Sequence, residues 1–142
     1  MATRSAIGYK LPTGEVRGIY CHWDGYVENN GKILQEHYQA AYKIAAMVEL
    51  GDMSSLGAEI GAQIDFNDPT AHKGQCTYYG RDRGETDVGT QTYNDVDDFV
   101  THYADAVQYM YLWNGNEWIV TEGDLKFDRV EDQLAALALE AA

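Results

Sequence analysis

The dipeptide Asn114-Gly115 constrains the fold of this chain more than any other feature, because it lies between two strand-like runs. A tight two-residue hairpin turn needs positive φ at its central residues, and Asn-Gly adopts that conformation readily. Residues 107–113 and 117–121 flank the dipeptide and are rich in aromatic and β-branched residues, which favour strands. The sequence therefore predicts an antiparallel hairpin, whose first strand carries Val107, Tyr109, Tyr111 and Trp113 on one face.

A second hairpin is predicted near the N-terminus, where Pro12-Thr13-Gly14 separates strand-like runs over residues 5–11 and 16–23. Residues 76–79 add a short strand. We therefore expect an α+β fold, in which an antiparallel sheet built from the two hairpins and this short strand packs against two or three helices.

Two internal helices are predicted from the spacing of apolar residues. Residues 31–50 read as one helix that Gly51 would end, with Tyr38 as the point where it could bend. Residues 95–106 give the clearest pattern, because Phe99 and Tyr103 fall on one face and acidic residues on the other. Residues 52–75 and 80–92 lack periodicity and are rich in Gly, Asp and Asn, so we expect long loops there.

The C-terminal segment is predicted to form a helical tail. Asp128 and Glu131 resemble a capping box, and Val130, Leu134 and Leu137 follow at helical spacing. This pattern divides the chain into an α+β domain over residues 1–123 and a tail over residues 124–142. Because so short a helix is marginal alone in water, we expect it to dock on the domain or on a second copy, as a homodimer contact.

Charge is distributed unevenly along the chain. Residues 80–142 hold 14 Asp and Glu against four Lys and Arg, whereas residues 1–79 hold nine against six, which together give the net charge of −13. Such a surface repels nucleic acid and anionic membranes and attracts basic partners. We predict an acidic partner-binding face made of Asp82, Glu85, Asp87, Asp95, Asp97, Asp98 and Asp105. The alternative for any one acidic stripe is a helix face that is acidic only because it is solvated.

No catalytic or metal-binding motif stands out in the sequence. Cys21 and His22 are neighbours on a predicted strand, where successive side chains point to opposite faces, so they cannot pair as nucleophile and base. The spacing of His72 and Cys76 suits zinc, but no second pair completes a tetrahedral site. We therefore expect no enzyme activity, no metal and no cofactor. With no long apolar run in the chain, we also expect a cytoplasmic protein whose cysteines are thiols.

A small-ligand site is the alternative function. His22, Trp23, Asp24 and Tyr26 gather aromatic and polar groups at the end of a strand, where they could stack on a planar ligand. Arg81 and Arg83 could clamp an anion such as a nucleotide. The competing interpretation is that the aromatic residues close the core and that Asp82 and Glu85 pair with the two arginines.

Five segments of the chain resemble known sequences: Thr3–Ile7, Val16–Tyr26, Asn30–Leu34, Tyr79–Glu85 and Trp118–Val120. Together they resemble a family of small bacteriophage and prophage proteins, and the His-Trp-Asp-Gly-Tyr run is the most specific part. The resemblance brings no activity with it. It implies an accessory role inside an infected bacterium, where small acidic phage proteins often inhibit nucleic-acid-binding defence systems; that step is an analogy of setting and charge.

Charge and resemblance together give one expected function. We expect a phage-encoded, non-enzymatic protein of the host bacterial cytoplasm whose acidic surface occupies the basic nucleic-acid site of a host defence complex, of the CRISPR–Cas or restriction type. Such a protein would act as a DNA mimic and would bind neither nucleic acid nor membrane itself.

Overall fold

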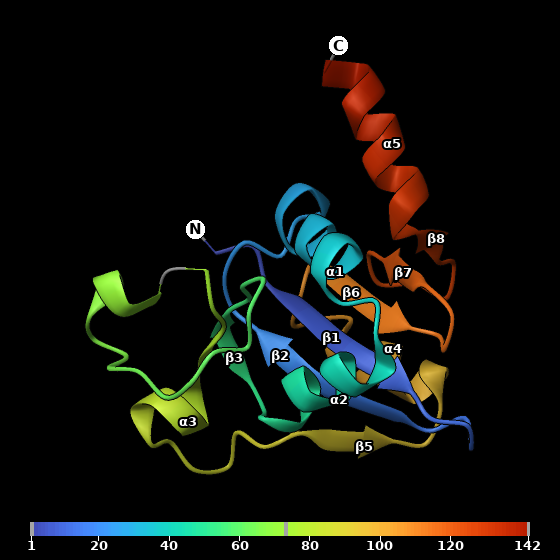
Figure 1. Ribbon diagram of the computed structural model, residues 1–142. Helices are drawn as coiled ribbons and strands as arrows, with labels where there is room; N and C mark the ends of the chain where they lie inside the picture. Colours follow the sequence, from blue (N-terminus) through green and yellow to red (C-terminus); the bar gives the residue numbers. More distant parts are fainter. Residues whose placement is uncertain (1, 73, 142) are drawn as a thin grey trace.

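The computed structural model describes residues 2–72 and 74–141, so Met1 and Ala142, at the ends of the predicted domain and tail, lie outside the described residues. These residues form an α+β fold with eight strands in one open, mixed sheet (Figure 1). The strands are β1 (Ser5–Lys10), β2 (Val16–Cys21), β3 (Met53–Ser55), β4 (Thr77–Tyr78), β5 (Gln91–Tyr93), β6 (Tyr109–Trp113), β7 (Trp118–Thr121) and β8 (Asp128–Arg129). Their order is β4-β3-β2-β1-β6-β7-β8, and β5 also pairs with β2.

Both predicted hairpins are confirmed. β1 pairs antiparallel with β2 so that Ile7 lies opposite Ile19, and β6 pairs antiparallel with β7 so that Leu112 lies opposite Ile119. The prediction of a purely antiparallel sheet is wrong, because β1 runs parallel to β6 and β2 runs parallel to β3. A turn sequence fixes pairing only within its own hairpin, whereas the pairing between hairpins depends on the long connection that crosses over the sheet.

One face of the sheet is covered by the helices that follow β2 (Figure 1). A π-helical turn, η1 (Val27–Gly31), leads into α1 (Lys32–His37), and α2 (Ala41–Glu49) follows. The prediction of a single helix over residues 31–50 is therefore wrong. The break comes at Tyr38, whose buried ring turns inward and whose hydroxyl donates to the Gly57 carbonyl at 2.7 Å.

The other face of the sheet is covered by α4 (Val96–Tyr103), which confirms the clearest helix predicted from the sequence. Its buried side is formed by Phe99, Val100 and Tyr103, as the apolar spacing indicated. Phe99 lies directly on the sheet because Gly8 and Gly18 present no side chain to it. A Cβ added at Gly18 would come within 2.8 Å of the Phe99 ring, so close packing of α4 depends on these glycines.

The two predicted loops contain regular structure that the sequence pattern did not reveal. Residues 52–75 include β3, and a 3₁₀ turn, η2, spans Pro69–His72. Residues 80–92 include most of α3 (Tyr79–Arg83), which begins one residue before the predicted loop, and the first two residues of β5. These elements are three to five residues long, which is too short for a hydrophobic period to be visible.

The predicted tail contains a helix, which docks on the domain along one apolar stripe. β8 pairs with β7, and α5 (Val130–Ala141) begins with the buried Val130. Leu134 and Leu137, further along the helix, are partly buried and pack against the same core, so the predicted stripe of Val130, Leu134 and Leu137 docks on the domain. The C-terminal end of α5 projects from the body of the protein (Figure 1). Within the described residues, the helices are too short or too polar to cross a lipid bilayer.

Candidate acidic interface

The acidic residues of α4 lie on the side that faces away from the sheet. Asp95 caps the helix, since its carboxylate accepts the Asp98 N–H at 2.8 Å, and it is exposed. Asp97, Asp98 and Asp105 are also exposed. None of these four carboxylates forms an ion pair with a Lys, Arg or His residue in the described part of the chain. Their negative charge therefore stands uncompensated at the surface.

Most of the arginines, by contrast, are held in pairs within the protein. Arg17 pairs with Glu49, and Arg129 contacts three carboxylates, those of Glu117, Glu131 and Asp132. These arginines are offset by their own carboxylate partners, so they do not offset the acids of α4 or the exposed Asp87.

The Arg83 guanidinium pairs with Glu85, donating from Nε at 2.6 Å, and it also lies over the Phe66 and Tyr79 rings. This is the pairing that the competing interpretation predicted for the segment. Glu85 therefore reaches the surface with its charge partly balanced, and Arg83 has an aromatic platform of its own chain beneath it.

Asp82 does not take part in the acidic face, because its side chain is 0% exposed. Its carboxylate accepts the backbone N–H groups of Tyr78 at 2.8 Å and Ile64 at 3.1 Å and the Nε–H of Arg81 at 2.9 Å. Burial would raise the pKa of this carboxyl, but these hydrogen bonds outweigh it and hold the pKa below its usual value. Asp82 thus fastens α3 to the loop that contains Ile64.

The hydrogen-bond donors of Arg81 are also fully occupied within the protein. Its guanidinium donates to both Asp82 oxygens and to the carbonyls of Ile60, Gly61 and Cys76, and it lies over the Tyr78 ring. Since a guanidinium has five N–H donors, these bonds occupy them all. An anionic ligand would have to displace internal partners in order to reach Arg81.

The segment from His22 to Tyr26 is partly open to solvent. The His22 Nδ1 atom and the Tyr20 hydroxyl share a hydrogen bond of 2.6 Å, and the edge of the Trp23 ring meets His22 at a centroid distance of 4.7 Å. Trp23 is 45% exposed and Tyr26 is 39% exposed. Asp24 is exposed as well and adopts a positive φ of 56°. The rings of Trp23 and Tyr26 therefore remain available for contacts, whereas Arg81 and Arg83 are engaged by partners within the protein.

Both cysteines are buried thiols. Burial raises the pKa of Cys21 to about 12, so that the thiol stays protonated near neutral pH. Cys76 is surrounded by the Tyr38 hydroxyl and the backbone of Gly57, and burial raises its pKa as well. In the described ranges, no three His, Cys, Asp or Glu side chains come together as a metal site.

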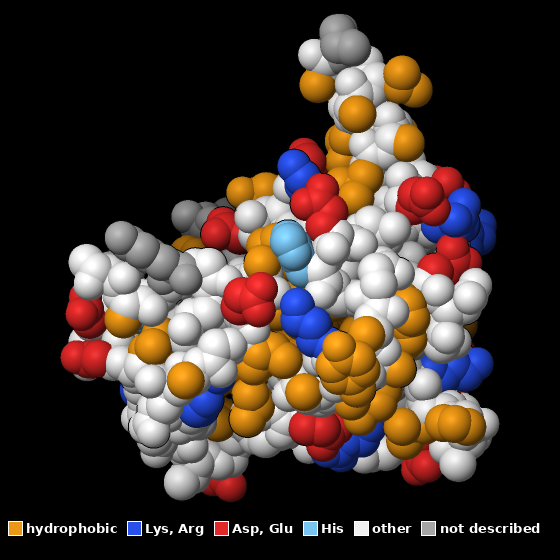
Figure 2. Space-filling view, in the orientation of Figure 1, with side chains coloured by type: hydrophobic (Ala, Val, Ile, Leu, Met, Phe, Trp, Pro, Cys, Tyr) orange, Lys and Arg blue, Asp and Glu red, His pale blue; other side chains and the backbone are white. Residues whose placement is uncertain are grey.

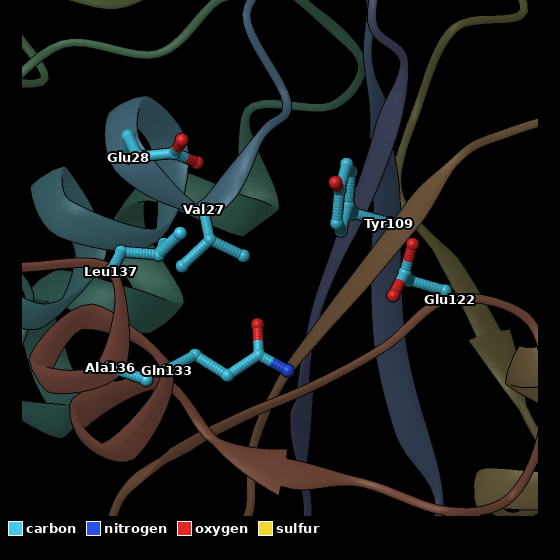
Figure 3. Close-up of a pocket in the computed structure, with 7 residues that line it drawn as sticks. All are labelled: Val27, Glu28, Tyr109, Glu122, Gln133, Ala136 and Leu137. Atoms are coloured by element: carbon cyan, nitrogen blue, oxygen red, sulfur yellow. The ribbon is translucent and has the colours of Figure 1, made fainter. Parts of the chain in front are cut away.

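A second acidic feature was not found from the sequence. A pocket of about 330 Å³ opens between η1, the start of β6 and α5, and two glutamates, Glu28 and Glu122, line it together with the Tyr109 ring (Figure 3). Gln133 reaches in from α5 (Figure 3). Burial raises the pKa of Tyr109, and the two nearby glutamates raise it further, which reflects a negative potential in the pocket.

The pocket residues come from η1, β6, α5 and the loop that follows β7, so no spacing in the sequence connects them all. In chemical terms, two carboxylates beside an aromatic ring suit a cationic group, which the ring face also attracts. The exposed acids of α4 and this pocket are thus both suited to positively charged partners. Comparisons of the chain with family models, with curated proteins and with solved structures found no match.

Proposed function

We propose that this chain is a phage-encoded, non-enzymatic binding protein that acts in the cytoplasm of the host bacterium. Its acidic surface occupies the basic nucleic-acid site of a host defence complex, of the CRISPR–Cas or restriction type, and so keeps DNA or RNA out. The proposal rests on charge and on the resemblance to phage proteins described above.

One observation carries the proposal: the protein pairs most of its arginines internally and leaves the carboxylates of α4 exposed. Asp97 and Asp98 lie in the first turn of the helix and Asp105 follows its end, so the charges are spaced along one element. Exposed charges act over a Debye length of about 8 Å at physiological salt. A row of carboxylates along a helix therefore has the same sign of charge as a phosphate backbone and can bind in a basic groove.

The pocket beside Tyr109 supports the same kind of partner. A lysine or arginine side chain that enters it would meet Glu28 and Glu122 and could lie against the tyrosine ring. Because η1 and α5 pack on the face of the sheet opposite α4, the pocket would be a contact separate from the α4 carboxylates, which would mainly speed the encounter.

The test is a phage-plating experiment in bacterial strains that each carry one CRISPR–Cas or restriction system. Expression of this chain should restore plating of a targeted phage in at least one strain, and the purified protein should displace DNA or RNA from that strain's defence complex. The triple variant Asp97→Asn, Asp98→Asn and Asp105→Asn keeps the Asp95 cap. It should slow association with the complex by roughly tenfold at low salt, because steering depends on net surface charge.

A matched control removes three exposed acids elsewhere: Glu59→Gln, Asp65→Asn and Asp68→Asn, from the segment between β3 and β4 on the far side of the molecule from α4 (Figure 1). An equal loss in both triples would show that only total charge matters and that α4 is not the interface. Full activity of the α4 triple would contradict the proposal for this helix. If nucleotides raise the melting temperature and no strain is relieved, the small-ligand function at His22, Trp23, Asp24 and Tyr26 is favoured instead.

A further inference from the structure

The sheet is open, so its outer strands carry backbone groups that no neighbouring strand uses. Natural sheet edges are usually protected by charged residues, by proline or by internal partners. β8 consists of two charged residues, and in β4 the Tyr78 N–H is taken up by the Asp82 carboxylate at 2.8 Å. β5 pairs with β2 on one side and contains neither a charged residue nor a proline. Its outer side is therefore an unprotected edge.

The pairing with β2 shows which way the backbone of β5 points. The Tyr20 N–H of β2 points away from β1, because it donates to the Asp52 carboxylate at 2.9 Å. Alternate residues of a strand point their N–H and C=O groups to the same side, so Val16 and Gly18 also point away from β1 and bond the last and first residues of β5. Thr92 is the middle residue of β5, and its N–H and C=O therefore point away from β2.

The outward backbone groups of Thr92 are open to solvent. Thr92 is exposed, and beyond the sheet pairing its N–H and C=O form no hydrogen bond within residues 2–72 and 74–141. β5 lies along the lower margin of the molecule in Figure 1, with no other element below it. The Thr92 hydroxyl accepts a hydrogen bond from Arg17 at 2.7 Å, so the side chain is held on the face of the sheet and does not cover the edge.

The charges around β5 decide what kind of strand can pair with it. Residues 84–125 contain no Lys or Arg, and the exposed Asp87 and Asp95 lie before and after the strand. Arg17, which contacts β5, is paired with Glu49, and above β5 in Figure 2 basic and acidic side chains adjoin one another. A second copy of this chain would bring like charges together at the edge, whereas a basic segment would meet opposite charges.

We propose that β5 takes up an extended, basic segment of the partner protein as an additional strand of the sheet. Thr92 donates its N–H to a carbonyl of that segment and accepts an N–H with its own carbonyl, while arginine or lysine side chains of the segment meet Asp87 and Asp95. Strand addition of this kind is a common mode of peptide binding. This pairing rests on the proposed function, which supplies the basic partner, and it names the element on which that partner docks.

The test uses a peptide of about ten residues that alternates arginine with threonine, and it measures amide hydrogen exchange by NMR on the full chain. In the free protein the Thr92 amide should exchange rapidly, whereas the Gln91 and Tyr93 amides, which face β2, should be protected. Saturating peptide should slow the exchange of Thr92 by roughly tenfold or more. A peptide of the same charge with every amide nitrogen methylated cannot donate backbone hydrogen bonds, and it should leave the exchange of Thr92 unchanged.

Two variants of the same residue test the edge directly. Thr92→Pro removes the outward N–H and keeps the bonds that the neighbouring residues form with β2, and proline is tolerated at such a position of an edge strand. It should weaken binding of the peptide roughly tenfold. Thr92→Val is the matched control, because it loses the hydroxyl contact with Arg17 but keeps the N–H, and it should bind the peptide as the wild type does. If Thr92→Pro does not fold, the exchange measurement on the wild type decides.

A Thr92 amide that is already protected in the free protein, or that still exchanges rapidly at saturating peptide, would overturn the inference. So would equal peptide binding by folded Thr92→Pro and Thr92→Val. Failure of the proposed function gives a different result. A peptide that binds without slowing Thr92 exchange removes only the strand pairing, whereas strand pairing with the peptide, without relief of any defence system, removes only the proposed function.

Discussion

Among the charged residues described above, we expect a substitution in the buried ion pair of Asp82 and Arg81 to change the stability of the protein most. Asp82→Asn removes a buried charge and leaves the Arg81 guanidinium without its counter-ion, so we expect a loss of about 3 kcal/mol in the free energy of unfolding at pH 7. Urea unfolding measures it. Asp97→Asn is the control, because Asp97 is exposed, and it should change the free energy by less than about 0.5 kcal/mol.

The same substitution has a defined pH dependence. The pKa of Asp82 is lowered in the folded protein, so its charged form contributes stability above the unfolded pKa of about 3.9, and that contribution is lost as the pH falls through the lower folded pKa. The difference between wild type and Asp82→Asn should therefore shrink as the pH is lowered from 5 to 2. A difference that stays constant over this range would show that the Asp82 charge is not what stabilises α3.

At this scale, the sequence shows which residues pair but not where they lie. The pairing of Arg83 with Glu85 followed from their spacing, and the structure contains it. The burial of Asp82 did not follow, because it depends on Ile64, which is distant in the chain. Asp82, which the sequence placed in the acidic face, is thus a structural group. In the same way, the sequence gives no sign that Glu28 and Glu122 line one pocket.

In α4, two substitutions of Asp95 separate the effect of its charge from the effect of its capping hydrogen bond. The Asp95 side chain caps the first turn. Asp95→Ala should therefore lower the free energy of unfolding by about 1 kcal/mol, whereas Asp95→Asn should cost only a few tenths, since asparagine also caps well. Thermal and urea unfolding of the two variants measure this. An equal loss in both would mean that the negative charge at the helix start matters more than the cap.

Elements with a local signal were predictable, and those set by distant contacts were not. The hairpins follow from Pro12-Thr13-Gly14 and Asn114-Gly115, and α4 follows from its apolar face. The break between α1 and α2 follows from Tyr38, whose hydroxyl finds Gly57 only in the folded chain. The parallel pairing of β1 with β6 joins segments about a hundred residues apart, and no turn between them specifies it.

For the molecule as a whole, two opposing electrostatic effects decide how salt changes stability. The exposed ion pairs, such as those of Arg17 and Arg129, weaken when salt is added, but each such pair stabilises by only about 0–1 kcal/mol. The net charge of −13 acts in the other direction, because the repulsion among unpaired carboxylates is relieved by screening. We expect the repulsion to be the larger effect, since the uncompensated acids outnumber the surface pairs.

The melting temperature should therefore rise as NaCl is increased from 0.02 to 0.5 M. A gain of about 1–2 kcal/mol in a chain of this size corresponds to a rise of roughly 3–6 °C. The measurement is made at one low protein concentration, so that association between chains does not add to the shift. The triple variant of Asp97, Asp98 and Asp105 should show a smaller rise, because it carries fewer unpaired charges to screen. A melting temperature that falls with salt would mean that the local ion pairs, and not the acidic surface, dominate the electrostatics of this protein, which would also weaken the case for an acidic interface on α4.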